Sequence, residues 1–497
     1  MFGLFRSRPR KGGIIHRICR AFSAAEVSRL LKPWTWDGGF SNQEVAAGLA
    51  LIRARSRDMQ KNSEHYARWL DLFVANVVGD NGFTLIPKPA TAEDVTATDA
   101  KAAKFLKYHF WKWATNPLFS DMTGRKTFAA ICRLAAENWA RDGESVVFID
   151  RHAQNPYGIA LRMIRPDALD ELANGKVNDG TNTIRNGVEI DAKTLRPVAY
   201  YFRAEKEDTT ADFVAGRKVQ RIAAADILHI FTQHDECQTR GIPLGHPVLR
   251  KLKMLDEYNV SELVAARDEA NTTGIFSAPV GRDGELGEYT EEQDAALTMP
   301  SEPGTKIKLE PGWDYKTVTP SHPNRELTAF KNSMLRDIAT GLCVEYANFS
   351  NDWAGVSFSS VRAGTLAERD HWRMLQAQMV EQFVSPVFNA WLESFLKLAA
   401  SGSYSSADFS RLSEHEFRGR RWDWVDPMKD VNASVIAVAH NWKTNEQIAA
   451  DYGCDIDENI EANARLKAKA TELGVAPPAP QGTKTTPDNA DDKDGEK

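Results

Sequence analysis

The segment 361–400 constrains the fold most, because it contains the longest regular pattern in the chain. Large apolar residues recur there at every fourth position: Leu375, Met379, Phe383, Val387, Trp391 and Phe395. Positions four apart lie on the same side of a helix, so the spacing predicts one long helix with a single apolar stripe. Pro386 interrupts the pattern and has no amide to donate, so we expect a kink at this point.

Two further helices are predicted before this segment. In 246–274 the apolar anchors are Leu249, Leu252, Leu255 and Leu263, and in 324–342 apolar residues recur at steps of three and four. The segment between them, 275–323, is rich in turn residues and contains short β-prone runs. A stretch of small, polar and aromatic residues, NDWAGVSFSSVRAG (351–364), separates the second helix from the long one.

The region upstream of these helices predicts a mixed unit of helices and strands over 51–245. The run SEHYARWLDLFVANVVGDNG reads as a helix with Asn62 or Ser63 as its cap and Gly79 as its stop. The run TFAAICRLAAENWARDGESVVFID reads as a helix, an Asp142–Gly143 turn and a strand. Four short β-prone runs follow: GIALRMIRP, NGVEID, RPVAYYFRA and ADILHIFT. The fold class expected is therefore α+β.

The two ends of the chain differ from the middle. Residues 1–50 begin with a basic stretch that reads as a flexible arm, and it lacks the apolar core of a signal peptide. Residues 401–474 are mostly helical from Pro427 onward. The last segment, 475–497, combines Pro, Thr, Gly and acids without periodicity, which predicts a disordered tail.

Composition excludes several classes of protein. The 497 residues are 42% hydrophobic and 26% charged, which is ordinary for a globular chain, and the net charge of -6 gives no broad basic surface for nucleic acid. The 5 cysteines form no C-x-x-C pair, so we expect reduced thiols and no zinc site. No apolar run is long enough to cross a bilayer, so no stable membrane insertion is expected.

Reactive motifs are missing from the sequence. There is no G-x-x-x-x-G-K-[ST] phosphate loop and no G-x-S-x-G nucleophile elbow. His229, His234 and Cys237 could be read as metal ligands, but their spacing fits no standard zinc module, and ordinary turn residues are the favoured interpretation. The sequence thus predicts no catalytic residues, no cofactor and no metal.

Several phrases, read in order, resemble the portal proteins of tailed bacteriophages of the lambda type. They are SEHYARWLDLFVANVVGDNG, DGESVVFI, NGVEIDAKTLRPVAYYF, ADILHIFTQHDECQTRGIPLGHPVL, EYANFSNDWAGVSFSSVRAG and WDWVDP. The resemblance covers about 53–470. One departure is Phe358, where this family more often has Tyr, so a hydrogen bond at that point is in doubt.

The resemblance implies a ring of identical subunits, typically twelve, at one vertex of the capsid. Double-stranded DNA passes through such a ring without sequence-specific binding, driven by a separate terminase whose large subunit docks on the ring. The further partners it implies are the major capsid and scaffold proteins and the head-tail connector proteins. The location it implies is the virion, with assembly in the cytoplasm of the bacterial host.

The resemblance also implies a division of the chain into the parts of a portal subunit. The expected parts are an arm and lead-in (1–50), a wing (51–245), a first stem helix (246–274), a clip (275–323), a second stem helix (324–343), a tunnel loop (344–360), a long kinked helix (361–400), a crown (401–474) and a tail (475–497). The stem residues expected at the contact between subunits are Leu327, Phe330, Met334, Leu335 and Ile338.

The resemblance places the tunnel loop in the DNA channel. The residues expected there are Asn351, Asp352, Trp353, Ala354, Gly355, Val356, Ser357 and Phe358, with Trp353, Val356 and Phe358 as bulky points and Gly355 as a pivot. No Lys or Arg precedes Arg362 in this stretch, which suits a conduit, because basic groups would hold the phosphate backbone. An ordinary connection between two helices is the alternative.

Two hypotheses of function remain from the sequence. The first is a DNA channel without catalysis of its own. The second is a hydrolytic enzyme, a nuclease or protease acting on DNA or capsid components, whose carboxylates or Ser/His pair are hidden by spacing. Assembly separates them, since a channel needs a closed ring of heterologous contacts and a typical hydrolase works as a monomer or dimer.

Overall fold

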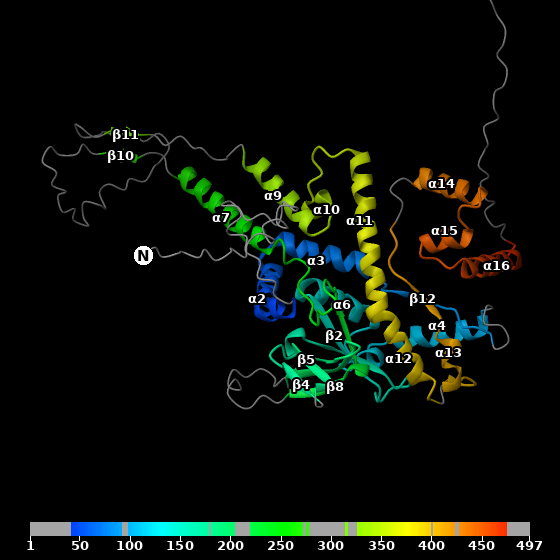
Figure 1. The fold of residues 1–497 in the computed structure, drawn as a ribbon. Helices are drawn as coiled ribbons and strands as arrows, with labels where there is room; N and C mark the ends of the chain where they lie inside the picture. Colours follow the sequence, from blue (N-terminus) through cyan, green and yellow to red (C-terminus); the bar gives the residue numbers. More distant parts are fainter. Residues whose placement is uncertain are drawn as a thin grey trace, which may run out of the picture.

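The computed structural model describes residues 41–91, 98–177, 180–203, 219–271, 275–277, 314–316, 326–398, 401–422 and 427–474. Most of the expected arm and clip and the whole expected tail lie outside these residues. The described part contains both helices and sheets, which confirms the α+β class (Figure 1).

The helices follow the predicted pattern closely. The α-helices are α2 (Ser41–Asn62), α3 (Glu64–Val77), α4 (Ala100–Thr115), α5 (Pro117–Ser120), α6 (Phe128–Asp142), α7 (Leu249–Asn271), α9 (Leu327–Gly341), α10 (Tyr346–Ser350), α11 (Phe358–Met379), α12 (Ser385–Phe395), α13 (Phe409–Leu412), α14 (Pro427–Ala439), α15 (Asn445–Asp451) and α16 (Ile456–Glu472). Short 3-10 turns cover Pro166–Ala168, Ala224–Asp226 and Ser406–Asp408, and a π-helical turn covers Val380–Val384.

The strands form small antiparallel sheets. They are β1 (Thr84–Pro87), β2 (Glu144–Asp150), β3 (Ala160–Ile164), β4 (Gly175–Val177), β5 (Asn182–Arg185), β6 (Val188–Asp191), β7 (Pro197–Arg203), β8 (Val219–Ala223), β9 (Ile227–Phe231), β10 (Ile275–Ser277), β11 (Asp314–Lys316) and β12 (His415–Arg418). One sheet has the order β3-β2-β9 and a second is a meander, β4-β5-β6-β7-β8. In the first sheet Val147 of β2 lies opposite Met163 of β3 and Leu228 of β9.

The turn between α6 and β2 forms where the sequence predicts it. Thr127 caps the start of α6, accepting a hydrogen bond from the amide of Ala130 at 3.3 Å. Gly143 ends the helix with φ 86°, a left-handed conformation that favours glycine. A Cβ at this position would lie 2.1 Å from the carbonyl carbon of Ile242, so the close approach of these two segments also requires glycine.

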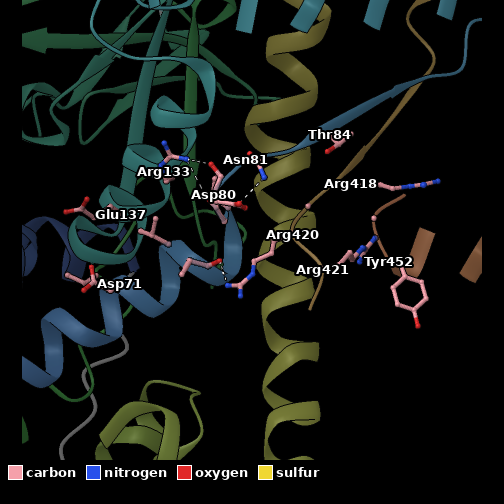
Figure 2. Close-up of a pocket in the computed structure, with 18 of the residues that line it drawn as sticks. Asp71, Asp80, Asn81, Thr84, Arg133, Glu137, Arg418, Arg420, Arg421 and Tyr452 are labelled. Atoms are coloured by element: carbon pink, nitrogen blue, oxygen red, sulfur yellow. Dashed lines mark hydrogen bonds between the residues drawn. The ribbon is translucent and has the colours of Figure 1, made fainter. Parts of the chain in front are cut away.

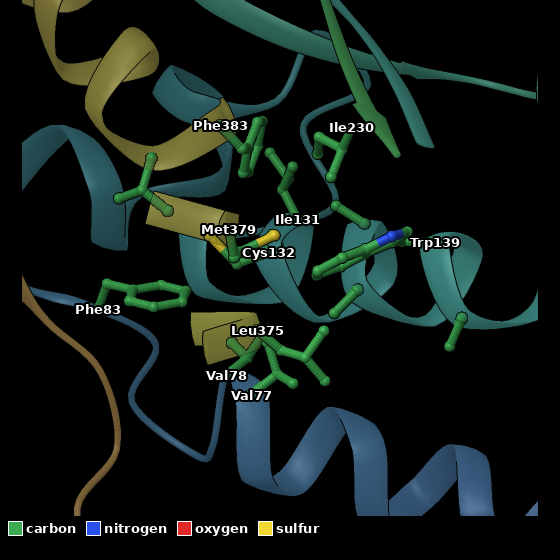
Figure 3. Close-up of a cluster of buried hydrophobic side chains, with 14 of the residues drawn as sticks. Val77, Val78, Phe83, Ile131, Cys132, Trp139, Ile230, Leu375, Met379 and Phe383 are labelled. Atoms are coloured by element: carbon green, nitrogen blue, oxygen red, sulfur yellow. The ribbon is translucent and has the colours of Figure 1, made fainter. Parts of the chain in front are cut away.

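The main core lies between α3, α6, the first sheet and the α11–α12 line. Figure 3 shows side chains from these elements converging, with Cys132 of α6 next to Met379 of α11. Phe73 of α3 contacts the rings of Trp139 and Trp372 edge-on, at centroid distances of 5.6 and 5.8 Å. Such pairs add about 0.5–1.5 kcal/mol to the burial of each ring.

The long helix is interrupted near the expected kink. α11 passes into the π-helical turn Val380–Val384, and α12 then begins with Pro386 in its first turn. The helical turns run on through this point, and the amide of Ser385 donates to the carbonyl of Val380, five residues earlier. The wider π turn accommodates the proline, which has no amide to donate. Figure 1 shows that α12 leaves the direction of α11. The π turn thus absorbs the interruption at which the sequence predicts a kink.

Two findings on the connection of the parts were not expected from the sequence. α2 is one helix across the expected boundary between residues 50 and 51. β12 pairs with β1, with Phe417 opposite Leu85, so a strand after residue 400 belongs to a sheet that begins near residue 84. The pairing of β12 with β1 has no local signal, because it depends on contacts between distant segments.

Candidate functional site

The loop Asn351–Ser357, here called the 351–357 loop, joins α10 to α11 at the upper end of the long helix (Figure 1). It is shorter than the expected range 344–360, because Tyr346–Ser350 is helical and α11 already begins at Phe358. Asn351 ends α10 with φ 57°, and the Ser357 side chain caps α11 by accepting a hydrogen bond from the amide of Ser360 at 3.2 Å.

Asp352 anchors the base of this loop. Its carboxylate accepts hydrogen bonds from the Tyr346 hydroxyl at 2.9 Å, from Nδ2 of Asn332 at 3.4 Å and from the amide of Ala354 at 3.0 Å. The hydrogen bond from the Ala354 amide and then that from Tyr346 lower the pKa of Asp352. The loop is therefore tied to α9 and α10 at one point.

The tip of the loop is exposed. Trp353 is 49% exposed, and Ala354 and Gly355 lie on the surface. Gly355 has φ +71°, and a Cβ built there would have no neighbour within 4 Å. Val356 is half-buried, while the side chain of Phe358 lies outside the described part of the structure. The expected bulky points Trp353 and Val356 thus differ in exposure.

The helices that carry the loop are held together by a nearly buried acid. Glu368 of α11 accepts hydrogen bonds from Nδ2 of Asn348 at 2.6 Å and from Nε1 of Trp372 at 3.0 Å. The backbone amide of Glu345 donates to the same carboxylate at 3.3 Å. Gly364 lets α11 approach this point, because a Cβ there would lie 2.5 Å from Oε2 of Glu345. The exposed tip therefore extends from a rigid support.

The tip itself carries no basic residue, although the positive charge of Arg336 in α9 acts on Asp352 at the base of the loop. Residues 351–361 contain neither Lys nor Arg. Nη2 of Arg362, the first guanidinium after the tip, contacts Oδ1 of Asp430 in α14 at 2.7 Å. The positive charge that follows the loop most closely in the sequence, that of Arg362, is thus paired within the chain.

The expected stem helices lie against each other, with their residues in different environments. Nζ of Lys251 in α7 contacts Asp337 of α9 at 3.0 Å, and the rings of Tyr258 and Phe330 meet at 5.3 Å. Leu249, Leu252 and Leu255 of α7 are buried as expected, whereas Leu263 is 71% exposed. Leu263 is therefore not an anchor within the chain.

The predicted contact stripe on α9 needs a correction. Leu335 and Ile338 are buried in the core of their own chain, so they are not available to a neighbouring subunit. Met334 and Leu327 are half-buried, and Phe330 is exposed. The correction arises because a stripe read from the sequence does not distinguish the side of a helix that meets its own chain from the side that meets another.

A buried ionic cluster around Glu144, at the start of β2, was missed by sequence reasoning. Oε1 of Glu144 lies 2.6 Å from Nη2 of Arg53 in α2 and 2.6 Å from Nη2 of Arg240. Oε2 lies 3.0 Å from Nε2 of His229 and accepts a hydrogen bond from the amide of Gly241 at 2.9 Å. Burial raises the pKa of Glu144, but the charges of Arg240 and Arg53 outweigh burial and hold it well below its usual range.

This cluster contains the partner of the His229 ring. Nε2 of the ring bonds the Glu144 carboxylate, whereas Cys237 is exposed and donates its amide to Oδ1 of Asp235 at 2.9 Å. Within the described residues, no group of three or more His, Cys, Asp and Glu side chains is placed to hold a metal ion. No signal in the sequence could have found the cluster, since its members come from segments far apart in the chain.

An open cleft of about 1000 Å³ lies between the end of α3, α6 and the segment that follows β12 (Figure 2). Both acids and bases line it: Asp71, Asp80, Glu137, Arg133, Arg418, Arg420 and Arg421. Nη1 of Arg420 donates to the carbonyl of Ala75 at 2.6 Å, and Nη1 of Arg133 donates to that of Asp80 at 2.7 Å. Arg420 thus bonds a carbonyl in the last turn of α3, where a positive charge is favourable, and Arg133 holds the turn that follows the helix.

Of the described helices, none is both long and apolar enough to cross a membrane.

The model of the family described as "Phage portal protein, lambda family" matches residues 28–376. The chain belongs to this family. The match includes α9, α10, the 351–357 loop and most of α11. The elements that carry the candidate site therefore lie within the matched region.

Curated relatives agree with this family over nearly the whole chain. A probable portal protein of Halomonas phage phiHAP-1 is 28% identical over 96% of this chain and 92% of its own length. Portal protein B of Escherichia phage lambda is 24% identical, covering 90% of this chain and 89% of its own. The portal protein of Escherichia phage N15 is 22% identical, with 90% of each chain covered.

Among solved structures, the chain is similar to components of gene transfer agent particles. A chain from the neck of an empty particle gives a TM-score of 0.44 at 14% identity, covering 86% of this chain and 98% of that chain. A chain from the neck of a native particle gives 0.40 at 13% identity, covering 84% and 92%.

The family decides between the two hypotheses from the sequence. The chain is a portal protein, and none of the relatives named above is a nuclease or protease. The residues expected to line the channel remain predictions, as do Leu327, Phe330 and Met334 at the expected contact between subunits.

Proposed function

We propose that this chain forms a closed ring of identical subunits at one capsid vertex, through which double-stranded DNA enters during packaging and leaves on ejection. The observation that carries the proposal is the 351–357 loop in a chain of the portal family: an exposed tip without basic residues on a rigid base. The parts expected from the sequence, wing, stem, clip, tunnel loop and crown, belong to this proposal.

The loop is suited to meet DNA without holding it. A protein that neutralises phosphates with Lys or Arg releases counterions and binds tightly, so a channel that lets DNA slide has to limit such contacts. The tip presents Trp353, Ala354 and Gly355, none of which carries charge, and Arg362 is paired with Asp430. Sliding is therefore favoured over binding.

The anchor at Asp352 gives the tip a fixed starting point. Because Asp352 is tied to α9 and α10, movement of the loop is confined to the residues that follow it. Gly355 has a left-handed backbone and open space where a Cβ would stand, so the tip can change direction at this residue. In a ring, each subunit would contribute one such tip to the channel.

The chain has no catalysis of its own in this proposal. Its partners are the terminase large subunit, which supplies the energy for packaging, the major capsid and scaffold proteins and the head-tail connector proteins. The proposed setting is the capsid vertex of the virion, after assembly in the host cytoplasm. Purified protein should not hydrolyse ATP or cleave DNA, and activity that persists through independent separation steps would contradict this.

Imaging of the purified chain by negative-stain electron microscopy tests the assembly directly. Rings with a central hole are expected, and compact small particles without rings would contradict the proposal. Mass measurement of the same sample gives the number of subunits.

A lysine introduced at the tip tests the role of the loop. Ala354→Lys should leave assembly intact, because Ala354 is exposed, but it should reduce the length of DNA packaged into heads, more at low salt than at high salt. Gly355 is unsuitable for this test because its left-handed φ would strain any other residue. The matched control is Ala192→Lys, an exposed alanine in the turn after β6. Full-length genomes with both variants at both salt concentrations would mean that the loop does not meet DNA.

A further inference from the structure

Arg421, in the segment that follows β12, is a half-buried arginine without a counter-charge. It lines the open cleft of Figure 2, and its Nε is buried without a hydrogen-bond partner. Among the residues that the structure describes, none accepts a hydrogen bond from its guanidinium or forms an ion pair with it. Arginines that leave the solvent are usually paired, so this one requires an explanation.

The two arginines that precede it in the same segment are bonded. Nη1 of Arg420 donates to the carbonyl of Ala75 at 2.6 Å. Nη1 of Arg418 donates to the carbonyl of Cys454 at 2.7 Å. Figure 2 shows Arg420 turned toward α3 and Arg421 turned away from it. Arg421 therefore differs from both neighbours in having no acceptor.

The acids nearest to Arg421 are already paired with other cations. The charges of Asp451 and Glu416 act on Arg421. Oδ2 of Asp451, however, contacts Nζ of Lys443 at 2.6 Å. Oε2 of Glu416 contacts Nζ of Lys88 at 2.8 Å. Neither carboxylate is left to neutralise Arg421.

Two further guanidinium groups add positive charge at this end of the cleft. Burial lowers the pKa of Arg421 most, followed by the charge of Arg373, and the charge of Arg418 lowers it further. An arginine nevertheless stays charged at any ordinary pH. The cleft therefore holds a positive charge that an anion from outside the chain would stabilise.

We propose that Arg421 and Arg418 form a binding site for a phosphate group at this end of the cleft. A guanidinium presents a planar fork of donors that matches the oxygens of a phosphate or a carboxylate. Phosphate is favoured because one fork occupies both oxygens of a carboxylate, whereas a phosphate has further oxygens for a second guanidinium. The Arg418 side chain is only 12% exposed, and its Nε and Nη1 bond Glu416 and Cys454, which leaves Nη2 for the ligand.

The cleft leaves room for this ligand. Its volume is about 1000 Å³, and the phosphate group could come from free phosphate or from a nucleic-acid backbone. Gly453 has φ +78°, and a Cβ there would lie 3.2 Å from Cγ of Arg421, so the turn after α15 packs closely on the stem of this arginine. Of the described 351–357 loop, no residue lines the cleft, so the site is separate from the proposed DNA contact in the channel.

Isothermal titration calorimetry on the full-length protein tests the site. Inorganic phosphate and a short DNA duplex without terminal phosphates are titrated separately, in chloride buffer at constant ionic strength. At least one of them should bind, and Arg421→Gln should weaken this binding at least about tenfold, because a charged fork of hydrogen bonds is lost. Arg196→Gln, which changes an exposed arginine between β6 and β7, is the control and should bind like the wild type.

The two ligands identify the source of the phosphate group. Binding of inorganic phosphate indicates a site for the free ion, and binding of the duplex alone indicates a site for the DNA backbone. A tetraglutamate peptide is the third ligand. If the peptide alone bound, and Arg421→Gln weakened it, the proposal would be overturned in favour of a carboxylate site. Binding that Arg421→Gln leaves unchanged, or no binding of any ligand, would also overturn it.

Thermal unfolding gives an independent readout. In chloride buffer Arg421→Gln removes a half-buried charge that has no partner, so its unfolding temperature should equal or exceed that of the wild type. Added phosphate should raise the unfolding temperature of the wild type and of Arg196→Gln more than that of Arg421→Gln, because a ligand stabilises the folded state that binds it. Equal rises in the three proteins would overturn the proposal. A lower unfolding temperature of Arg421→Gln in chloride alone would do the same, since it would show that the guanidinium is already paired.

Discussion

The two ends of the α11–α12 line are surrounded differently. At the lower end Trp391 and Phe395 are fully buried and stack on each other at 5.0 Å. At the upper end the 351–357 loop exposes Trp353 and leaves Gly355 without neighbours. Large aromatic residues at both ends look alike in the sequence, so the comparison shows that burial, not residue type, separates a residue that stabilises the fold from one that is free to meet a partner.

The largest difference in stability is expected between two matched tryptophan substitutions, one at each end of the line. Trp391→Ala removes a fully buried ring and should lower the free energy of unfolding by about 3–5 kcal/mol. Trp353→Ala removes an exposed ring and should change it by no more than about 0.5 kcal/mol. Urea denaturation followed by fluorescence measures both. Similar losses for the two variants would mean that the loop is packed in solution.

A second prediction concerns the Glu144 cluster, which is buried like the lower end of the α11–α12 line. Glu144→Gln leaves Arg53 and Arg240 buried without their counter-charge and should cost about 3 kcal/mol of unfolding free energy. Glu144→Ala is the control for removing the whole side chain. A variant as stable as the wild type would show that the cluster does not hold α2 to the sheet.

The same cluster predicts a pH dependence. The pKa of Glu144 is lower in the folded than in the unfolded chain, so its contribution is complete above its ordinary value of about 4.5. The contribution is lost as the pH falls from there through the folded pKa. Unfolding temperatures measured from pH 7 downward should therefore fall more steeply below about 4.5 for the wild type than for Glu144→Gln. Parallel curves would contradict the assignment.

A small and local effect is expected from the cap of α11, at the exposed end of the line. Ser357→Ala removes the N-cap of α11 and should cost about 0.5–1 kcal/mol, confined to the first turn of the helix. Ser359→Ala, in the same turn but not at the cap, is the control. Hydrogen exchange of the amides of 358–361 should be faster only in the first variant, and no difference between them would show that the cap is not formed in solution.

Local patterns predicted much of the fold. The helix α3 (Glu64–Val77), the turn at Gly143 and the strand after it lie where the sequence places them, because apolar periodicity and left-handed glycines are local signals. Ser63 occupies the predicted N-cap position of α3, but its side chain makes no capping hydrogen bond. The kink near Pro386 was also predicted, but the π turn that accommodates it was not. Pairing of β12 with β1 depends on segments far apart, which periodicity cannot detect.

The candidate site was predictable in position and less so in detail. The small residues and missing cations of the 351–357 loop are visible in the sequence, whereas its anchor at Asp352 needs Tyr346 and Asn332 to come together in space. Leu335 and Ile338 were assigned to a subunit contact because their spacing is that of any apolar stripe, and only the packing shows that they face their own core.

The central claim is that the tip of the 351–357 loop meets DNA in the channel, and photo-crosslinking in heads stalled during packaging tests it most directly. A diazirine amino acid at Ala354 should crosslink to the packaged DNA, while the same group at Ala192 should not. Crosslinking to DNA from Ala192 alone, or from neither position in heads that contain DNA, would contradict the account.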